Sequence, residues 1–390
     1  MVSGAARLAS VLAEGLVEAG HETLVIAASD RSEGGYGEEN GRLRIERLPS
    51  RYNPARVGQR FLLWPQRAIS EWVASFQPDI IHLHDPLTLA LCGLRAAGRQ
   101  QIPVLLTLHQ LPWFVSKYRP TFWVNPISIE WLLWRYGSWL VRRCAATIAL
   151  TQQVASSIWQ QTGCCAYIIP YGADLRRFQA GPLERAEAKR LRQRLGLAAE
   201  KPIILHVGRL DMDKDAHFVV AAAARVMEQV DAELLMVGDG RQREALEKLC
   251  AVLGIADRSY FTGFIAHDEG LPDIYRLADV FVTASEIETF GLVLLEAMAS
   301  ACPVVGVKTP CVAETARDGK CGFLVQPRDV AALAEKVVWL LRNPQAAGQM
   351  GLAGQAISRR FNKETMIEAH VQLYQTTLQA NRRLFTHHHE

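Results

Sequence analysis

Two glutamates, Glu288 and Glu296, lie on either side of a glycine, Gly291, in the stretch 283–300. The apolar run before them, 279–282, predicts a buried strand, and a helix is expected to begin near Gly291. The free N–H groups of a helix N-terminus suit a phosphate, and glycine lets the backbone approach a ligand closely. A buried carboxylate such as Glu296 needs good hydrogen-bond donors, and sugar hydroxyls are natural ones. The pattern favours a ligand with phosphate and hydroxyl groups, bound at the carboxyl edge of a sheet.

Both glutamates also have a purely structural interpretation. In it, Glu296 pairs with a buried Arg or Lys, and Glu288 is a solvated carboxylate in the loop. The residue types by themselves leave the two interpretations open.

A second cluster of chemistry-bearing residues follows the predicted strand 202–207. Gly208 ends this strand, Arg209 and Lys214 come directly after it, and a helix is expected next. A guanidinium forks onto phosphate oxygens and an ammonium adds a point charge, so the cluster is typical of a diphosphate receptor. Exposed loops also carry Arg and Lys without binding anything, so this cluster is moderate evidence taken alone.

Two histidines follow neighbouring predicted strands in the first half of the chain. His84 comes after the strand 79–83, and His109 comes after the strand 103–108. A lone histidine is more often structural than catalytic, but two at adjacent carboxyl edges favour a site.

Taken in order, these motifs resemble the signature of the family 4 retaining glycosyltransferases, which have the GT-B fold. The resemblance extends over nearly the whole chain and rests on Thr107-Leu108-His109, Gly208-Arg209 with Lys214, Gly238-Asp239-Gly240, Glu288 and Glu296 with seven residues between them, and Asp318-Gly319-x-x-Gly322. It implies two Rossmann-like, doubly wound parallel-sheet domains that face each other across a cleft. The expected divisions are an acceptor-side domain over 1–182, a nucleotide-sugar domain over 183–360, and a helix over 361–390 that packs back on the first domain.

The resemblance also implies a role for individual residues. His109, Arg209, Lys214 and Glu288 would be catalytic, with the two cations on the diphosphate, Glu288 orienting the sugar, and His109 contacting it from the first domain. The residues expected to bind the donor are Gly4, Gly208, Arg209, Lys214, Phe264, Ile265, Glu288, Phe290, Gly291, Leu292 and Glu296. Glu296 would hold the ribose, and the turn at Phe264 and Ile265 the base. Two positions depart from the family pattern: Asp215 stands where a glycine is usual, and Tyr171 where an asparagine is usual.

The alternation of helix and strand is already running at the start of the chain. A helix is predicted over 4–19 and a strand over 23–27, and Ser3-Gly4-Ala5 resembles the end of the family's glycine-rich loop. We therefore expect the first domain to lack its N-terminal strand, through either a misassigned start or an incomplete fragment. The polar, turn-rich stretch 29–60 is expected to form a mobile loop.

Length and composition exclude several classes of protein. A chain of 390 residues exceeds one compact core and predicts two domains. A net charge of +3 is too small to indicate a nucleic-acid partner. The eight cysteines form no Cys-x-x-Cys pair, so neither a zinc site nor a disulfide framework is indicated, and a reducing cytosol fits best. No apolar run reaches the roughly 18 residues of a membrane-spanning helix, and the first residues lack the basic start of a signal peptide.

The stretch 113–143 mixes tryptophans with arginines. Such a mixture suits a surface that enters a bilayer interface, with rings at headgroup depth and Arg on lipid phosphate. The alternative is that these tryptophans pack a domain core or a dimer contact. The first interpretation places the protein in the cytoplasm at the inner face of a membrane, with a lipid, a lipid-linked glycan or a small molecule as acceptor.

The function expected from all this is hexosyl transfer from a nucleotide-diphosphate sugar, with retention of configuration. No Asp-x-Asp motif is recognised in a loop suited to a metal, and an Arg/Lys pair can replace a cation, so neither a metal nor another cofactor is expected. An epimerase or phosphorylase on the same fold, and a non-catalytic or truncated nucleotide-sugar-binding protein, remain open. A Rossmann dehydrogenase is disfavoured because no Gly-x-Gly-x-x-Gly follows an early strand.

Overall fold

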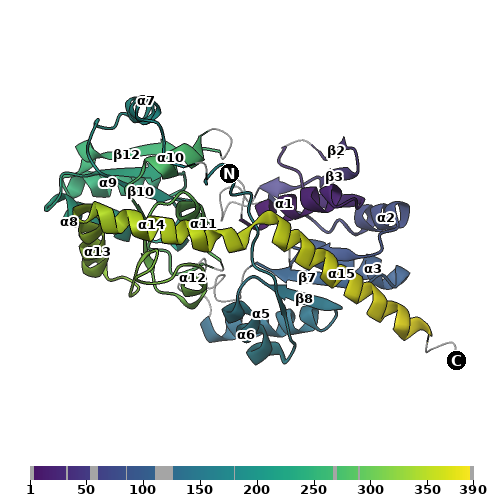
Figure 1. The fold of residues 1–390 in the computed structure, drawn as a ribbon. Helices are drawn as coiled ribbons and strands as arrows, with labels where there is room; N and C mark the ends of the chain where they lie inside the picture. Colours follow the sequence, from purple (N-terminus) through teal and green to yellow (C-terminus); the bar gives the residue numbers. More distant parts are fainter. Residues whose placement is uncertain are drawn as a thin grey trace. The chain divides into compact units, whose positions relative to one another are not determined.

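The computed structural model describes residues 4–31, 34–52, 60–84, 86–109, 126–179, 181–266, 270–288 and 290–386. The chain forms two compact units, shown as a ribbon in Figure 1. Unit 1 consists of 1–173 together with 361–390, and unit 2 of 174–360. The first boundary thus falls between residues 173 and 174, where the sequence analysis places it between 182 and 183.

Unit 2 is built on one six-stranded parallel sheet in the order β12-β11-β10-β13-β14-β15. Its strands are mostly apolar, as is typical of a parallel sheet covered on both faces, and all five residues of β10 are buried. The strand bounds are β10 (Ile203–Val207), β11 (Glu233–Val237), β12 (Ser259–Gly263), β13 (Val280–Val282), β14 (Val304–Val307) and β15 (Gly322–Val325).

Helices follow the strands of unit 2 in alternation. On one face, α8 (Ala216–Met227), α9 (Arg243–Val252) and α13 (Val330–Arg342) bury aliphatic side chains in one core with the strands. The remaining helices are α7 (Arg185–Leu195), η1 (Met212–Lys214), η2 (Ala256–Arg258), α10 (Leu271–Leu277), α11 (Leu292–Ala299), α12 (Pro310–Thr315), α14 (Pro344–Ser358) and η4 (Arg359–Phe361).

The described residues of unit 1 form two larger sheets and a short pair. The first sheet has the order β1-β3-β2, with β1 (Thr23–Ala28) parallel to β3 (Leu43–Leu48) and β2 (Tyr36–Asn40) antiparallel. The second is parallel, in the order β6-β7-β8-β9, with β6 (Ile81–Leu83), β7 (Val104–Leu108), β8 (Ala146–Ala149) and β9 (Tyr167–Ile168). The short pair joins β4 (Arg51–Tyr52) to β5 (Arg60–Phe61). The hairpin β2–β3 corrects the expectation of a mobile loop over 29–60, although 32–33 and 53–59 lie outside the described residues.

The helices of unit 1 cover these sheets. In the described parts of this unit they are α1 (Gly4–Glu18), α2 (Gln66–Phe76), α3 (Thr88–Gln100), α5 (Pro126–Val141), α6 (Gln152–Thr162) and α15 (Lys363–Thr386). Although α15 ends the chain, it packs beside α1, and Lys363 bonds Glu18 at 2.8 Å (Figure 1).

The two larger sheets of unit 1 meet at strands that are not paired with each other. Within the described ranges β1 pairs only with β3 and β6 only with β7, yet Ile26 of β1 and Ile81 of β6 pack against the same apolar cluster. All six residues of β1 are half-buried although its sequence, Thr-Leu-Val-Ile-Ala-Ala, resembles that of an interior strand. Within the described residues, the strands of unit 1 are thus divided between separate sheets, whereas those of unit 2 form one.

Candidate active site

The strand order of unit 2 positions the predicted site. β10 and β13 are neighbours in the sheet, but the chain passes through β11 and β12 between them, so the connections turn to opposite sides at this point. Ligands of open α/β sheets bind outside the carboxyl ends of the strands at such a switch point. The loop with Arg209 and Lys214 follows β10, and the loop with Glu288 follows β13, so both stand at this edge.

Lys214 and Glu288 join these two loops directly. Their Nζ and Oε1 atoms are 2.6 Å apart, and their side chains are only 21% and 14% exposed. Glu288 is therefore a largely buried member of an ion pair and not a solvated loop carboxylate. An ion pair so far withdrawn from water is less screened than a surface pair, so it fixes the relative position of the two loops.

Arg209 is held by two aspartates of its own loop. Its guanidinium donates to Asp213 at 2.7 Å and to Asp211, and the Asp213 side chain is only 1% exposed. Neither aspartate was predicted as a site residue, although Arg209 and Asp213 have the spacing i, i+4. The two aspartates do have Asp-x-Asp spacing, and in the structure they bind the guanidinium.

Glycines allow the loops at this edge to pack on each other. The Gly238 N–H donates to the Gly263 carbonyl at 2.8 Å, and a Cβ at Gly238 would lie 1.8 Å from the Gly208 carbonyl oxygen. A Cβ at Gly240 would lie 2.4 Å from the carbonyl oxygen of Leu210. The Gly-Asp-Gly motif thus lets the loop after β11 contact the loop that carries Arg209.

The helix α11 begins as the sequence predicts. Gly291 precedes it with φ +83°, a left-handed conformation that favours glycine, and Leu292 is its first residue. Phe290 is buried, and its carbonyl accepts a hydrogen bond from Thr315 Oγ1 at 2.9 Å. This bond anchors the loop just before the helix N-terminus.

Glu296 is 2% exposed, and its Oε2 accepts a hydrogen bond from the Tyr275 hydroxyl of α10 at 3.1 Å. The tyrosine is a partner that the sequence analysis did not foresee. Phe264 and Ile265 follow β12, which lies two strands from β10 at the same edge, and Phe264 is 51% exposed. The ten predicted donor residues of unit 2 thus come from loops at the carboxyl ends of β10, β12 and β13 and from α11.

The other two predicted residues, His109 and Gly4, belong to unit 1. His109 follows β7 and is buried, and its Nε2 lies 3.0 Å from His84 Nδ1. Burial lowers the pKa of His109 to about 4, so the ring is neutral near pH 7. Gly4 is exposed and begins α1.

The aromatic stretch 113–143 lies partly outside the described residues, which resume at 126. Within α5 the tryptophans divide: Trp134 is 8% exposed, whereas Trp131 and Trp139 are 61% and 38% exposed. Arg135 lies over the Trp131 ring and Arg143 over the Trp139 ring. The core interpretation therefore fits Trp134, whereas the exposure of the other two is what either a bilayer surface or a dimer contact requires.

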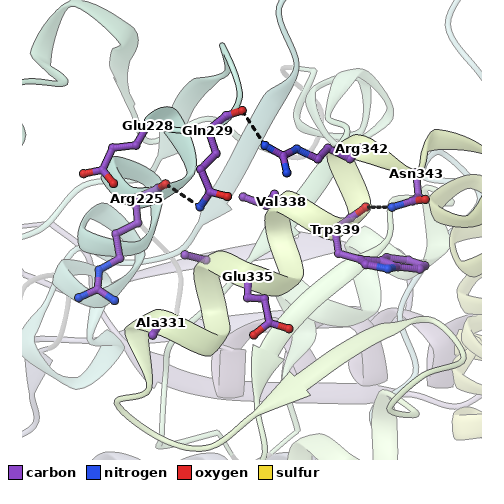
Figure 2. A pocket seen from close by; sticks show the side chains of 10 residues that line it. Arg225, Glu228, Gln229, Ala331, Glu335, Val338, Trp339, Arg342 and Asn343 are labelled. Carbon is purple, nitrogen blue, oxygen red and sulfur yellow. Dashed lines mark hydrogen bonds between the residues drawn. The ribbon is translucent and has the colours of Figure 1, made fainter.

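Within the described residues, no group of three or more His, Cys, Asp or Glu side chains is arranged to hold a metal ion, and no helix is long and apolar enough to cross a membrane. A surface hollow between α8 and α13 is lined by Arg225, Glu335 and Trp339 among others (Figure 2), and no predicted site residue lines it.

Comparison with known proteins accounts for both units. Residues 2–177 match the family model described as Glycosyltransferase Family 4, and residues 187–356 match the one described as Glycosyl transferases group 1. A 2-deoxystreptamine glucosyltransferase of Streptomyces kanamyceticus is 32% identical over 291 residues, 72% of this chain and 73% of that protein. A sulfoquinovosyl transferase of Arabidopsis thaliana is 29% identical over 357 residues, 89% of this chain, and the chain spans 65% of that protein's length.

Solved structures agree. A sucrose-phosphate synthase of Thermosynechococcus elongatus has a TM-score of 0.80 at 26% identity and covers 97% of this chain and 94% of its own. Anabaena HepE, solved with UDP and glucose, has a TM-score of 0.76 at 21% identity over 96% of each chain, which is a likeness of fold. With its two parallel-sheet units and its charged loops at the switch point of the second, the chain belongs to the family 4 glycosyltransferases and has the GT-B fold.

Proposed function

We propose that this glycosyltransferase is a retaining hexosyltransferase that takes its sugar from a nucleotide diphosphate and needs no divalent metal. The observation that carries the proposal is the pairing of Lys214 with Glu288 and of Arg209 with Asp211 and Asp213 at the switch point of unit 2. Two cations held in place by carboxylates can exchange those partners for the phosphates of a donor. Relatives support the donor class: HepE structures contain UDP or UDP-glucose, and a Mycobacterium tuberculosis relative is named as GDP-mannose-dependent.

In the proposed reaction, the bond between the anomeric carbon and the diphosphate breaks, and its electron pair goes to the departing phosphate oxygen. The acceptor hydroxyl forms the new bond on the same face of the sugar, and its proton passes to the departing diphosphate. Negative charge develops on the diphosphate as this bond breaks. Arg209, Lys214 and the N–H groups around Leu292 stabilise that charge and so lower the barrier. Glu288 orients the sugar, Glu296 holds the ribose, and His109 contacts the sugar.

The turn at Phe264 and Ile265, which leads out of β12, is the proposed contact for the base. Gly4 and Gly208 complete the proposed donor residues, Gly4 as the first residue of α1 and Gly208 at the end of β10.

We further propose that the acceptor is a membrane lipid or a lipid-linked glycan, met at the cytoplasmic face of the membrane. The exposed tryptophans of α5 support this, because indole rings with arginines beside them favour the headgroup region of a bilayer. Relatives from Acholeplasma laidlawii and Streptococcus pneumoniae, which are named as alpha-monoglucosyldiacylglycerol synthases, also support a lipid acceptor.

The test is product analysis with nucleotide sugars. A panel of UDP- and GDP-sugars is first screened by thermal shift, because a bound ligand raises the unfolding temperature by mass action. The stabilising donor is then incubated with diacylglycerol vesicles in EDTA, and NMR gives the anomeric configuration of the product. A glycolipid of the same configuration as the donor supports the proposal. Stabilisation without turnover indicates a binding protein, a converted nucleotide sugar indicates an epimerase, and dependence on added metal contradicts the metal-free mechanism.

A further inference from the structure

A cluster of histidines lies at the carboxyl edge of the second sheet in unit 1. His84 follows β6 and His109 follows β7, and the ring atoms His84 Nδ1 and His109 Nε2 are 3.0 Å apart. The two strands are neighbours in the sheet, so their register brings together two side chains that lie 25 residues apart.

His84 also packs against the ring of a third histidine, His82. The ring of His82 lies 4.2 Å from that of His84, centre to centre. His82 is itself fixed at both nitrogens, by the Thr107 hydroxyl and by the Tyr374 hydroxyl of α15, each at 2.7 Å. The position of His84 is therefore determined by its own strand, by β7 and by the last helix of the chain.

The contact between His84 and His109 is a hydrogen bond between neutral rings. Burial lowers the pKa of both histidines, that of His109 to about 4, so neither ring is charged near pH 7. A neutral imidazole has one N–H donor and one acceptor nitrogen. One of the two facing atoms must then carry the proton and the other must not, and this choice also decides the state of the second nitrogen of His109.

Metal binding is the other common use of clustered histidines. Within the described residues no three His, Cys, Asp or Glu side chains are placed to hold an ion. The hydrogen bond is therefore the interaction that the geometry supports.

We propose that His84 is a positioning residue that fixes the tautomer and the ring orientation of His109. The proposal rests on the proposed function, in which His109 contacts the donor sugar. His84 itself does not contact the sugar in the proposed function. It acts only by determining whether the free ring nitrogen of His109 is a donor or an acceptor. A histidine whose tautomer is set by a neighbour is a recurrent arrangement where one ring nitrogen must do chemistry.

The experiment compares two substitutions at one position. His84→Phe keeps a ring of similar size and removes the bond, whereas His84→Asn places an amide near the position of Nδ1 and can keep it. Histidine-selective ¹⁵N labelling reports the protonation of each His109 ring nitrogen, with His109→Asn used to identify the signals. We expect wild type and His84→Asn to show one His109 tautomer, and His84→Phe to show the other tautomer or a mixture.

Activity gives a second measurement. With donor and acceptor from the product analysis, we expect His84→Phe to lower kcat by about 10–100-fold with little change in the donor KM, because a misoriented group costs rate rather than binding. His84→Asn is expected to recover most of the loss. Unchanged His109 signals in a folded His84→Phe overturn the proposal, whatever its kcat. Absence of transfer by the wild type refutes the proposed function instead, and the ¹⁵N result then decides this inference alone.

Discussion

Lys214 Nζ lies 2.6 Å from Glu288 Oε1, although the two residues are 74 positions apart in sequence. The lysine follows β10 and the glutamate follows β13, so their ion pair connects the two loops at the switch point of the unit 2 sheet. The pair keeps the ammonium in place and compensates its charge. A diphosphate that binds here has to compete with the carboxylate for the lysine. The ammonium is thus held in a fixed position by the carboxylate.

Replacement of this lysine tests its role in catalysis. We expect Lys214→Ala to lower the transfer rate by about 10²–10³-fold, the usual cost of one group that stabilises developing charge. Lys248→Ala is the matched control, because Lys248 pairs with Glu244 at the same 2.6 Å on the exposed surface of α9. Initial rates at saturating donor measure both. Near wild-type turnover in folded Lys214→Ala contradicts the assigned role.

The glycine before α11 has a backbone requirement that a second substitution tests. Gly291 has φ +83°, so Gly291→Ala is expected to lower the free energy of unfolding by about 1–2 kcal/mol through strain in a left-handed conformation. Gly348→Ala is the control, because Gly348 lies inside α14 with open space around its Cβ position. Gly348→Ala is expected to raise the free energy of unfolding by about 0.5–1 kcal/mol, because alanine is favoured over glycine in a helix interior. Urea unfolding of both variants measures the difference, and equal effects at the two sites contradict the strain argument.

A buried histidine beneath the site gives unit 2 a pH dependence. Burial is the main cause that lowers the pKa of His206 to about 4, with Lys214 nearby acting in the same direction. Between its ordinary pKa of 6.5 and about 4, the unfolded chain binds a proton that the folded chain does not. Stability is therefore lost as the pH falls through this window, by about 1.4 kcal/mol per pH unit for this residue.

His206→Asn isolates that contribution. The amide can still donate to the Val282 carbonyl, which His206 Nδ1 contacts at 2.9 Å, but it does not titrate. The fall in the free energy of unfolding from about pH 6.5 to about pH 5 is expected to be about 2 kcal/mol smaller in the variant. Parallel pH profiles for the two proteins would refute the assignment.

The exposed tryptophans of α5 predict binding to membranes. Wild type is expected to sediment with anionic vesicles, and Trp131→Ala and Trp139→Ala to weaken that binding by about tenfold each, because each removes one large apolar group from the interface. Trp339→Ala in unit 2, where the ring is 40% exposed, serves as the control. Vesicle binding that both α5 variants leave unchanged contradicts a membrane role for this surface.

Local patterns predicted the secondary structure of unit 2 closely. The strand predicted over 202–207 is β10 (Ile203–Val207), and the helix expected near Gly291 is α11, which begins at Leu292. The helix α7 has equally plain local signals, since Glu184 and Glu187 form a capping box at its start and Gly196 ends it in a left-handed conformation. The hairpin β2–β3 was missed, because the glycines of 34–37 indicate a loop and the alternation of apolar and charged residues in β3 is short, extending over Leu-Arg-Ile-Glu only.

The site was predicted as a set of residues and not as a set of contacts. Types and motifs identified Lys214 and Glu288, but their ion pair depends on the adjacency of β10 and β13, which chain order does not encode. Asp213 had a local signal in its spacing from Arg209, whereas the contact of His84 with His109 again follows from the pairing of two strands. Contacts that follow from strand order are the part that sequence patterns leave undetermined.

The break between β1 and β6 has a consequence for how the molecule melts. In unit 2, six strands are hydrogen-bonded in one continuous sheet, which favours cooperative unfolding. In unit 1, two smaller sheets are connected through side chains of the helices packed between them. On heating, unit 1 is expected to unfold at a lower temperature than unit 2. A calorimetric scan would then contain two endotherms, and the cooler one would belong to the half that carries His109.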